Sequence, residues 1–149
     1  MMWFDTNLAV GSASDATNMV ECLASGVGVI LNVANDLHIV KWHGVELAQV
    51  GLIDGPGNQA AAYAAAVLVI EAFHRSGKKV LVCCHGGKSR SVAVAIMYLN
   101  HKSKVSRSFE VWLESVCERT DTDMAPPHKA HIDAYRKMNW SALTKLGDA

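Results

Sequence analysis

The feature that most constrains the fold is a long apolar stretch in the second half of the chain, interrupted by a short loop that contains two adjacent glycines. Lys79–Cys83 (KVLVC) is predicted to be a strand, because it is short, apolar and rich in β-branched residues. After the loop, from about Ser89, the segment SVAVAIMYL predicts a helix that is apolar on nearly all sides. Such a helix lies deep in a core. The sequence therefore predicts a strand–loop–helix unit at the centre of the molecule.

The rest of the chain predicts elements that surround this unit. Residues 27–33 are mostly apolar and β-branched, as in a strand covered on both faces. The other expected elements are strands at 39–42 and 45–53, and helices over 15–25, over 60–76 with Asn58 as its cap, from a cap at Ser106, and over about 127–138. The chain of 149 residues has no repeat and no linker. We therefore expect one compact α/β domain over residues 1–149, with a central, mostly parallel sheet flanked by helices.

Charge and cysteine content exclude several classes of protein. Fourteen basic and fourteen acidic side chains cancel, so the basic surface typical of nucleic-acid-binding proteins is not expected. The four cysteines include a neighbouring pair but no CxxC motif, which does not indicate a disulfide scaffold. The start of the chain has no basic leader, and the longest apolar run, 60–70, is too short to span a bilayer. We expect a soluble, cytoplasmic monomer.

The loop that follows the central strand has the composition of a phosphate cradle. It contains Gly86 and Gly87 and leads directly into the N-terminus of a helix. A loop of this kind directs successive backbone N–H groups into one concavity, beside the positive end of the helix dipole. The segment Gly87-Lys88-Ser89 matches the end of the GxxxxGK[ST] nucleotide-binding motif, but Val82 stands where that motif requires its first glycine. A nucleotide site is therefore disfavoured.

A second interpretation starts from Cys84 and Arg90, which five residues separate. A helix N-terminus and a nearby cation can lower a thiol pKa from about 8.5 to roughly 3.5–7.5, and both are expected beside Cys84. The planar guanidinium of Arg90 could bind two phosphate oxygens at once. The Ser91 hydroxyl could donate a hydrogen bond to the sulfur. The alternative is a buried, inert cysteine, which a lone cysteine would favour but this combination does not.

This segment resembles the active-site loop of the cysteine-dependent protein tyrosine phosphatases, particularly the small dual-specificity phosphatases, whose loop has the approximate pattern HCxxGxSRS. Here residues 83–91 are CCHGGKSRS. Residues 29–35 (VILNVAN) are similar to the family's early VLNV strand, and Asp54 lies 30 residues before Cys84, where the family has its general acid. The resemblance covers nearly the whole chain, from about Phe4 to Tyr135.

The resemblance implies a role for each residue of the loop and implies no metal or cofactor. Cys84 would attack phosphorus, Asp54 would protonate the leaving group, and Ser91 would assist departure of the sulfur. The expected phosphate-binding residues are His85, Gly86, Gly87, Lys88, Ser89 and Arg90. The chain departs from the family at Cys83, where a histidine that helps to lower the thiol pKa is usual. His85 could substitute for that histidine, and we interpret Cys83 as a packing residue.

Several assignments stay open at this point. Asp36, Asp121 and Asp123 are the alternative acids, since Asp-Gly at position 54 is also a common turn pair. His128 and His131 could share a helix face, but no third ligand type nearby supports a zinc site. The expected substrates are proteins phosphorylated on tyrosine and on serine or threonine. A phosphoinositide, for which Lys88 would be the indication, an RNA 5′ phosphate, and a phosphate-binding module without turnover are the alternatives.

Overall fold

A five-stranded sheet with the order β1-β2-β5-β3-β4 runs through the middle of the computed structural model, which describes residues 1–148. The strands are β1 (Met2–Trp3), β2 (Leu8–Gly11), β3 (Val27–Ala34), β4 (Glu46–Leu52) and β5 (Lys79–Cys83). β2, β5, β3 and β4 are parallel, and β1 pairs antiparallel with β2. The prediction of a mostly parallel sheet is confirmed. The carboxyl ends of β5, β3 and β4 therefore meet at one edge of the sheet.

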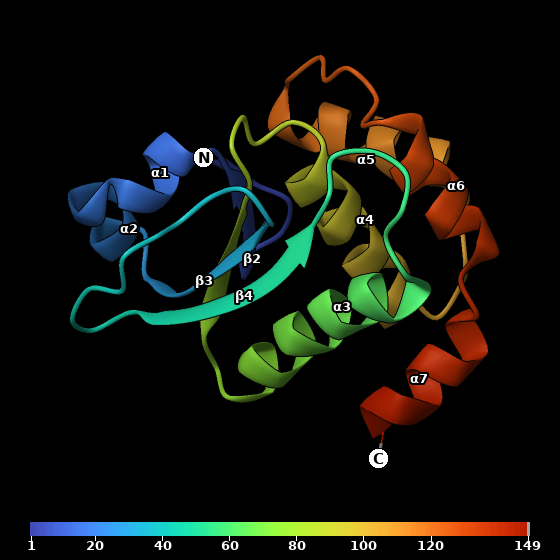
Figure 1. The fold of residues 1–149 in the computed structure, drawn as a ribbon, viewed down its shortest axis with the longest axis horizontal. Coiled ribbons are helices and arrows are strands. Elements are labelled where there is room, and N and C mark those ends of the chain that lie inside the picture. Colours follow the sequence, from blue (N-terminus) through green and yellow to red (C-terminus); the bar gives the residue numbers. More distant parts are fainter. Residues whose placement is uncertain (149) are drawn as a thin grey trace.

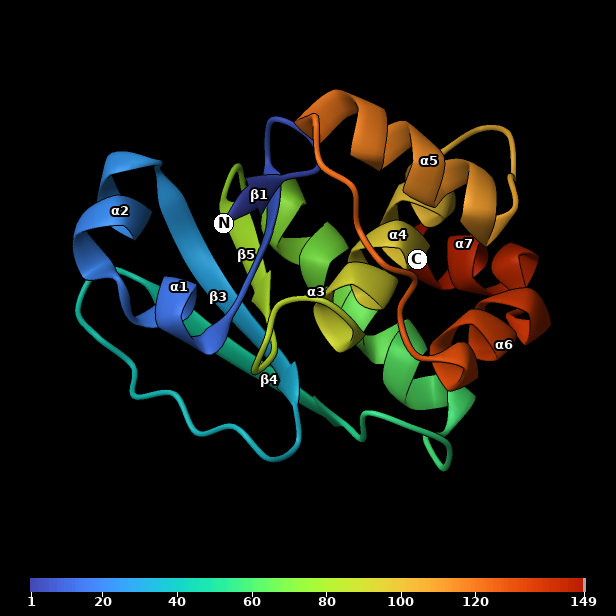
Figure 2. The same cartoon turned by 90° about the horizontal axis from the view of Figure 1, so that it is seen from above.

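Helices cover both faces of this sheet (Figures 1 and 2). The helices are α1 (Ala13–Thr17), α2 (Met19–Ala24), α3 (Ala60–Arg75), α4 (Arg90–Lys102), α5 (Phe109–Thr120), α6 (Lys129–Lys137) and α7 (Trp140–Asp148). Figure 2 shows α1 and α2 on one face and the remaining helices on the other. Each face has its own apolar core, the smaller one packed beneath α1 and α2. The α/β class and the flanking helices are thus as predicted.

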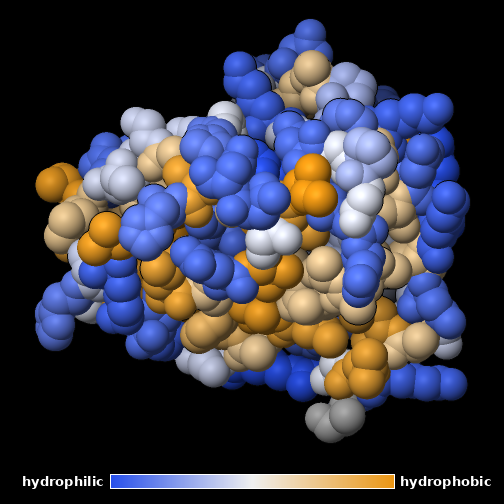
Figure 3. Space-filling model, in the orientation of Figure 1, coloured by the Kyte–Doolittle hydropathy of each residue, from blue (hydrophilic) through white to orange (hydrophobic). Residues whose placement is uncertain are grey.

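Helix α4 is the central helix of the larger core. Every residue from Arg90 to Asn100 is buried, which confirms the expectation from its all-round apolar sequence. Helix α3 packs beside it and leaves an alanine-rich, apolar surface toward solvent, visible in Figure 3. The apolar run 60–70 therefore belongs to a helix that covers the sheet. Within residues 1–148, no helix is long and apolar enough to cross a membrane.

Several predicted elements are wrong or displaced, each for a local reason. The predicted helix over 15–25 is broken at Asn18, whose side chain accepts a hydrogen bond from the N–H of Glu21 and caps a separate helix, α2. Residues 39–42 form no strand, although buried Ile39 and exposed Val40 imitate strand alternation. The sheet ends at β4, so they pair with no strand.

The helix caps and the chain ends also differ from prediction. Ser108, and not Ser106, caps α5, because the Ser106 hydroxyl bonds to the side chain of Asn100. The N-cap of α3 is Gln59, since both polar atoms of the Asn58 side chain are used in the preceding loop. No pattern in the sequence predicted β1, β2 or α7.

Ile96→Ala should destabilise the protein by about 2–5 kcal/mol, because Ile96 on α4 is fully buried and truncation leaves a cavity in the larger core. Val20→Ala is the control, since Val20 on α2 is 80% exposed and the same kind of truncation should change stability by less than about 0.5 kcal/mol. Urea unfolding followed by circular dichroism measures both. Equal losses for the two variants would contradict the placement of α4.

Candidate active site

The loop between β5 and α4 is held against the end of β2. The N–H of Cys84 donates to the carbonyl of Gly11 (3.4 Å), and the carbonyl of His85 accepts from the N–H of Ala13 (3.0 Å). Gly87 has a φ of +68°, and a Cβ at this position would lie 2.6 Å from the Gly11 carbonyl carbon. Only glycine fits this close approach without displacing the backbone. The loop is therefore fixed in a tight curve at the carboxyl edge of the sheet.

The Cys84 thiol lies inside this curve. Its sulfur is 3.1 Å from the Ser91 hydroxyl, and the residue is buried. Burial by itself raises the pKa of Cys84, but hydrogen bonds from the Ser91 hydroxyl and from the backbone N–H groups of Ser91, Ser89 and Gly87 outweigh it. The pKa of Cys84 is therefore lowered from its ordinary value. The geometry favours a thiolate.

Cys83 lies in a different environment, although it is the next residue in the chain. Because side chains alternate along a strand, Cys83 points into the smaller core, where it packs with Ala9, Cys22 and Leu81. Burial there, together with the nearby Cys84, raises the pKa of Cys83 to about 12. This placement agrees with its interpretation as a packing residue.

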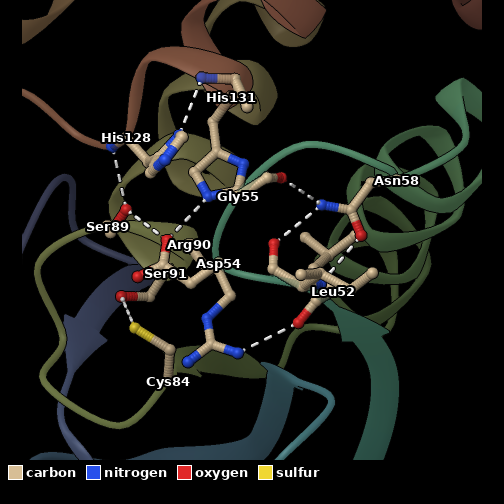
Figure 4. Close-up of polar contacts among 12 residues, drawn as sticks. Leu52, Asp54, Gly55, Asn58, Cys84, Ser89, Arg90, Ser91, His128 and His131 are labelled. Atoms are coloured by element: carbon tan, nitrogen blue, oxygen red, sulfur yellow. Dashed lines mark hydrogen bonds and ion pairs between the residues drawn. The ribbon is translucent and has the colours of Figure 1, made fainter.

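Arg90, the first residue of α4, is buried with part of its guanidinium unsatisfied. Its Nη1 donates to the carboxylate of Asp36 (2.8 Å) and to the carbonyl of Leu52 (3.0 Å), as Figure 4 shows for Leu52. Its Nε is buried and has no hydrogen-bond partner among residues 1–148. A buried donor without an acceptor costs free energy, so this atom is a candidate contact for a bound anion.

Asp36, one of the alternative acids suggested by the sequence, is hydrogen-bonded to Arg90. Its carboxylate pairs with Arg90, and the hydrogen bond from this guanidinium holds the pKa of Asp36 below its ordinary value. His85 Nε2 also bonds to the Asp36 carbonyl (3.0 Å). The His85 side chain is thus directed to Asp36, which does not support the idea that it replaces the missing histidine beside the sulfur.

Asp54 lies in the loop between β4 and α3, at the rim of the Cys84 loop. Its Oδ1 accepts hydrogen bonds from the Ser89 hydroxyl (2.8 Å) and from His131 Nε2 (3.0 Å), as Figure 4 shows. Partial burial raises the pKa of Asp54, but these two hydrogen bonds and the charge of Arg90 lower it by more, so the net shift is downward. The structure thus brings Asp54 together with Ser89, the residue that precedes Arg90.

The other two acids do not contact this centre in the same way. Asp121 ends α5 in a left-handed backbone conformation, with a φ of 50°. Asp123, with Gly87, Lys88 and Met124, lines a cavity of about 300 Å³ beside the loop. Lys88, Gly86 and the His85 side chain are exposed at the mouth of the loop. Of Asp54, Asp121 and Asp123, only Asp54 is hydrogen-bonded to a side chain of the loop within residues 1–148.

Sequence analysis missed His131, on α6, as part of this site. Its ring is fully buried, and its Nδ1 lies 2.6 Å from the Tyr63 hydroxyl. Its two partners, Tyr63 and Asp54, are 68 and 77 residues away in the chain, so no local pattern indicates the contact. His128 lies near it, and its backbone N–H donates to the Ser89 hydroxyl (3.0 Å). In residues 1–148 no group of three or more His, Cys, Asp or Glu could hold a metal ion.

The fold is similar to that of solved dual-specificity phosphatases. DUSP15 superimposes with a TM-score of 0.84 at 16% identity, covering 99% of this chain and 92% of that one. Human DUSP28 gives 0.80 at 24% identity, covering 98% and 99%. The human tyrosine phosphatase-like serine/threonine/tyrosine-interacting protein gives 0.77 at 20% identity, covering 96% of each chain. No protein-family model and no curated protein sequence matches the chain. The resemblance stated from the sequence is confirmed for the fold.

At neutral pH, iodoacetamide should alkylate Cys84 well before Cys83, because the thiolate form of Cys84 is stabilised and the pKa of Cys83 is raised to about 12. Ser91→Ala removes a hydrogen bond that lowers the Cys84 pKa, so the pH midpoint of alkylation should move upward. Peptide mapping by mass spectrometry assigns the modified residue at each pH. Preferential modification of Cys83 would show that the loop register is wrong.

Proposed function

We propose that this protein is a phosphatase that hydrolyses phosphate monoesters through a cysteinyl-phosphate intermediate on Cys84. The observation that carries the proposal is the environment of the loop. It combines a thiol that lies 3.1 Å from the Ser91 hydroxyl, and whose pKa this hydroxyl and the backbone N–H groups of Ser91, Ser89 and Gly87 lower, with a buried arginine whose Nε has no partner within residues 1–148. A phosphate dianion above the sulfur would satisfy that donor and the remaining amides.

In the first step, the Cys84 thiolate attacks phosphorus in line with the ester oxygen. A phosphorus–sulfur bond forms while the bond from phosphorus to the leaving oxygen breaks. Asp54, in its protonated form, gives its proton to that oxygen, which departs as an alcohol or phenol. The guanidinium of Arg90 and the loop amides stabilise the equatorial oxygens. Their orientation before the reaction should account for most of the reduction in barrier.

In the second step, water attacks the phosphocysteine. The Asp54 carboxylate accepts a proton from this water, an oxygen–phosphorus bond forms, and the phosphorus–sulfur bond breaks. The sulfur departs as a thiolate, which the Ser91 hydroxyl at 3.1 Å stabilises by donating a hydrogen bond. Inorganic phosphate leaves, and Asp54 is again protonated. The cycle needs no redox partner.

The proposed substrates are proteins phosphorylated on tyrosine and on serine or threonine. This class rests on the similarity of fold to dual-specificity phosphatases. One neighbour is named as a phosphatase-like interacting protein, so the fold by itself does not distinguish turnover from phosphate binding. The presence of Cys84, of Arg90 at the start of α4 and of Asp54 in the neighbouring β4–α3 loop favours turnover. Exposed Lys88 at the loop is the observation that favours a phosphoinositide as the second candidate.

Cys84→Ser should abolish release of phosphate from p-nitrophenyl phosphate, since an alcohol at this position is not ionised and cannot act as the nucleophile. Cys83→Ala should keep measurable activity, because its side chain lies in the smaller core. Wild-type activity should persist in EDTA and be blocked by vanadate, which imitates pentacoordinate phosphorus. Activity that is lost in EDTA and restored by magnesium or zinc would falsify the thiolate mechanism.

Asp54→Asn should lower kcat by roughly 10²–10⁴ on alkyl phosphates, the usual contribution of a general acid, and by less on p-nitrophenyl phosphate, whose leaving group departs unaided. Because the Asp54 pKa is lowered, the protonated acid becomes scarce as pH rises, so wild-type kcat/KM on alkyl phosphates should fall toward alkaline pH. The variant should lose this dependence.

The control for this experiment is Asp123→Asn, which removes a carboxylate from the cavity beside the same loop. It should leave the dependence on leaving group unchanged. An equal loss on every substrate for Asp54→Asn would indicate a folding role for Asp54. A loss that depends on the leaving group in Asp123→Asn would move the acid to that position.

A further inference from the structure

We infer that His131 is a positioning residue for Asp54: a directed chain of hydrogen bonds through Asn58, Tyr63 and His131 holds Oδ1 of Asp54 and leaves Oδ2 to carry the catalytic proton. The inference rests on the proposed function for the role of that proton. Hydrogen bonds join side chains from the β4–α3 loop, from α3 and from α6. Figure 4 shows two of them, Asn58 and His131, on the side of Asp54 away from the Cys84 sulfur.

The direction of each hydrogen bond follows from the chemistry of the groups. An ionised Asp54 can only accept, so His131 Nε2 must carry a hydrogen and donate it across 3.0 Å. Burial lowers the pKa of His131 against the opposing effect of Asp54, which favours the neutral ring. In a neutral ring with hydrogen on Nε2, Nδ1 is an acceptor, so the Tyr63 hydroxyl donates to it across 2.6 Å. One tautomer of His131 is thereby selected.

The hydrogen bonds at the far end of this network, those of Asn58, also have a defined donor and acceptor. The Asn58 side-chain amide donates to the Tyr63 oxygen (3.2 Å) and to the carbonyl of Ile53 (2.8 Å), while its Oδ1 accepts from the Ile53 N–H (2.8 Å). Asn58 thus joins the Asp54 loop to Tyr63 through groups that have fixed donor and acceptor roles. The loop that carries Asp54 and the ring that holds its carboxylate are parts of one network.

A second donor reaches the same carboxylate oxygen. Ser89 donates its hydroxyl hydrogen to Oδ1 of Asp54 (2.8 Å), and its oxygen accepts from the His128 N–H (3.0 Å). With two donors directed at Oδ1, a proton taken up by Asp54 resides on Oδ2. The arrangement therefore selects the carboxylate oxygen that exchanges protons with the substrate, the property that a general acid and base requires.

The charged and titratable groups around Asp54 set the direction of the expected pH effect. Arg90 of α4 lowers the Asp54 pKa by its charge, and the His131 ring does so by its hydrogen bond. The charges of His128, at the start of α6, and of Arg90 oppose protonation of His131, and Tyr63 of α3 is close enough to Asp54 for that carboxylate to raise the Tyr63 pKa. Loss of the His131 N–H donor should therefore raise the Asp54 pKa.

The chain contains a matched control for this arrangement. His74, in the last turn of α3, has its Nδ1 2.8 Å from the Tyr98 hydroxyl and its Nε2 2.8 Å from the Asn7 carbonyl. The chemistry is that of Tyr63 and His131, but the acceptor is a backbone oxygen and not Asp54. The pair lies at the end of α3 opposite to Tyr63, so its loss should affect stability and leave the active-site chemistry unchanged.

The test compares His131→Leu, His131→Gln, Tyr63→Phe and the control His74→Leu on an alkyl phosphate and on p-nitrophenyl phosphate. When the rates are compared on the acidic plateau of the pH profile, where Asp54 is protonated in both proteins, His131→Leu should lower kcat/KM on the alkyl phosphate by about 10-fold or more, part of the loss expected for removing the acid itself. It should change the aryl rate by less than about 3-fold. His131→Gln should restore most of the activity, because its amide oxygen can accept from Tyr63 and its amide nitrogen can donate to Asp54. Tyr63→Phe should show a smaller loss of the same kind.

Carboxyl-carbon NMR titration of Asp54 in these proteins supplies a readout that does not need turnover. The Asp54 pKa should be higher in His131→Leu than in wild type, and His131→Gln and His74→Leu should leave it near the wild-type value. An unchanged Asp54 pKa in folded His131→Leu, or an equal loss on both substrates, would overturn the positioning role. If the Asp54 pKa is higher in His131→Leu than in wild type, as expected, but the wild-type protein releases no phosphate, the proposed function is overturned instead.

Discussion

The contact between Gly87 and Gly11 is the constraint on which the site depends. The backbone of the loop crosses the end of β2 so closely that no side chain fits at Gly87, whose hypothetical Cβ would be 2.7 Å from the Ser12 nitrogen. This approach curves the loop and turns the amides of Gly87, Ser89 and Ser91 toward Cys84. The buried helix α4 then fixes where the curve ends. The close packing of the loop against β2 is therefore also what creates the polar environment of the Cys84 sulfur.

Around the Cys84 loop, the side chains of Arg90, Asp36 and Asp54 each have a partner of opposite charge or a hydrogen-bond donor. The guanidinium of Arg90 is buried and anchored by exposed Asp36, which lies at the carboxyl end of β3. Asp54 accepts two hydrogen bonds and also feels the charge of Arg90. Because burial penalises isolated charges, these partners make it possible for a cation and two carboxylates to remain ionised near a thiolate. In the proposed reaction, these groups are oriented before a phosphate binds.

The parts of the molecule that sequence predicts best are those fixed by near neighbours. Lys79–Cys83 is a strand with the bounds expected, and α4 begins within one residue of its expected start, because apolar runs and glycines are local signals. The partner of Arg90 was not predicted, since Asp36 meets it only through the parallel pairing of β3 and β5. His131 is a stronger example, because its contact with Tyr63 of α3 depends on how α6 packs among the other helices, against α4 and α5. Strand β2 was missed because Leu8–Gly11 is too short for a clear pattern.

Cys83, which precedes the proposed nucleophile, stands where dual-specificity phosphatases usually have a histidine. The structure shows why this difference need not prevent the Cys84 pKa from being lowered. Strand alternation directs the Cys83 side chain into the smaller core, beneath α1 and α2, where a small apolar group packs well. The groups that do most to lower the Cys84 pKa come after the sulfur in the chain, from Ser91, Ser89 and Gly87. Since these groups are backbone amides and one hydroxyl held by α4, they do not depend on residue 83. The stabilisation of the thiolate therefore resides in the loop and in the helix that follows it.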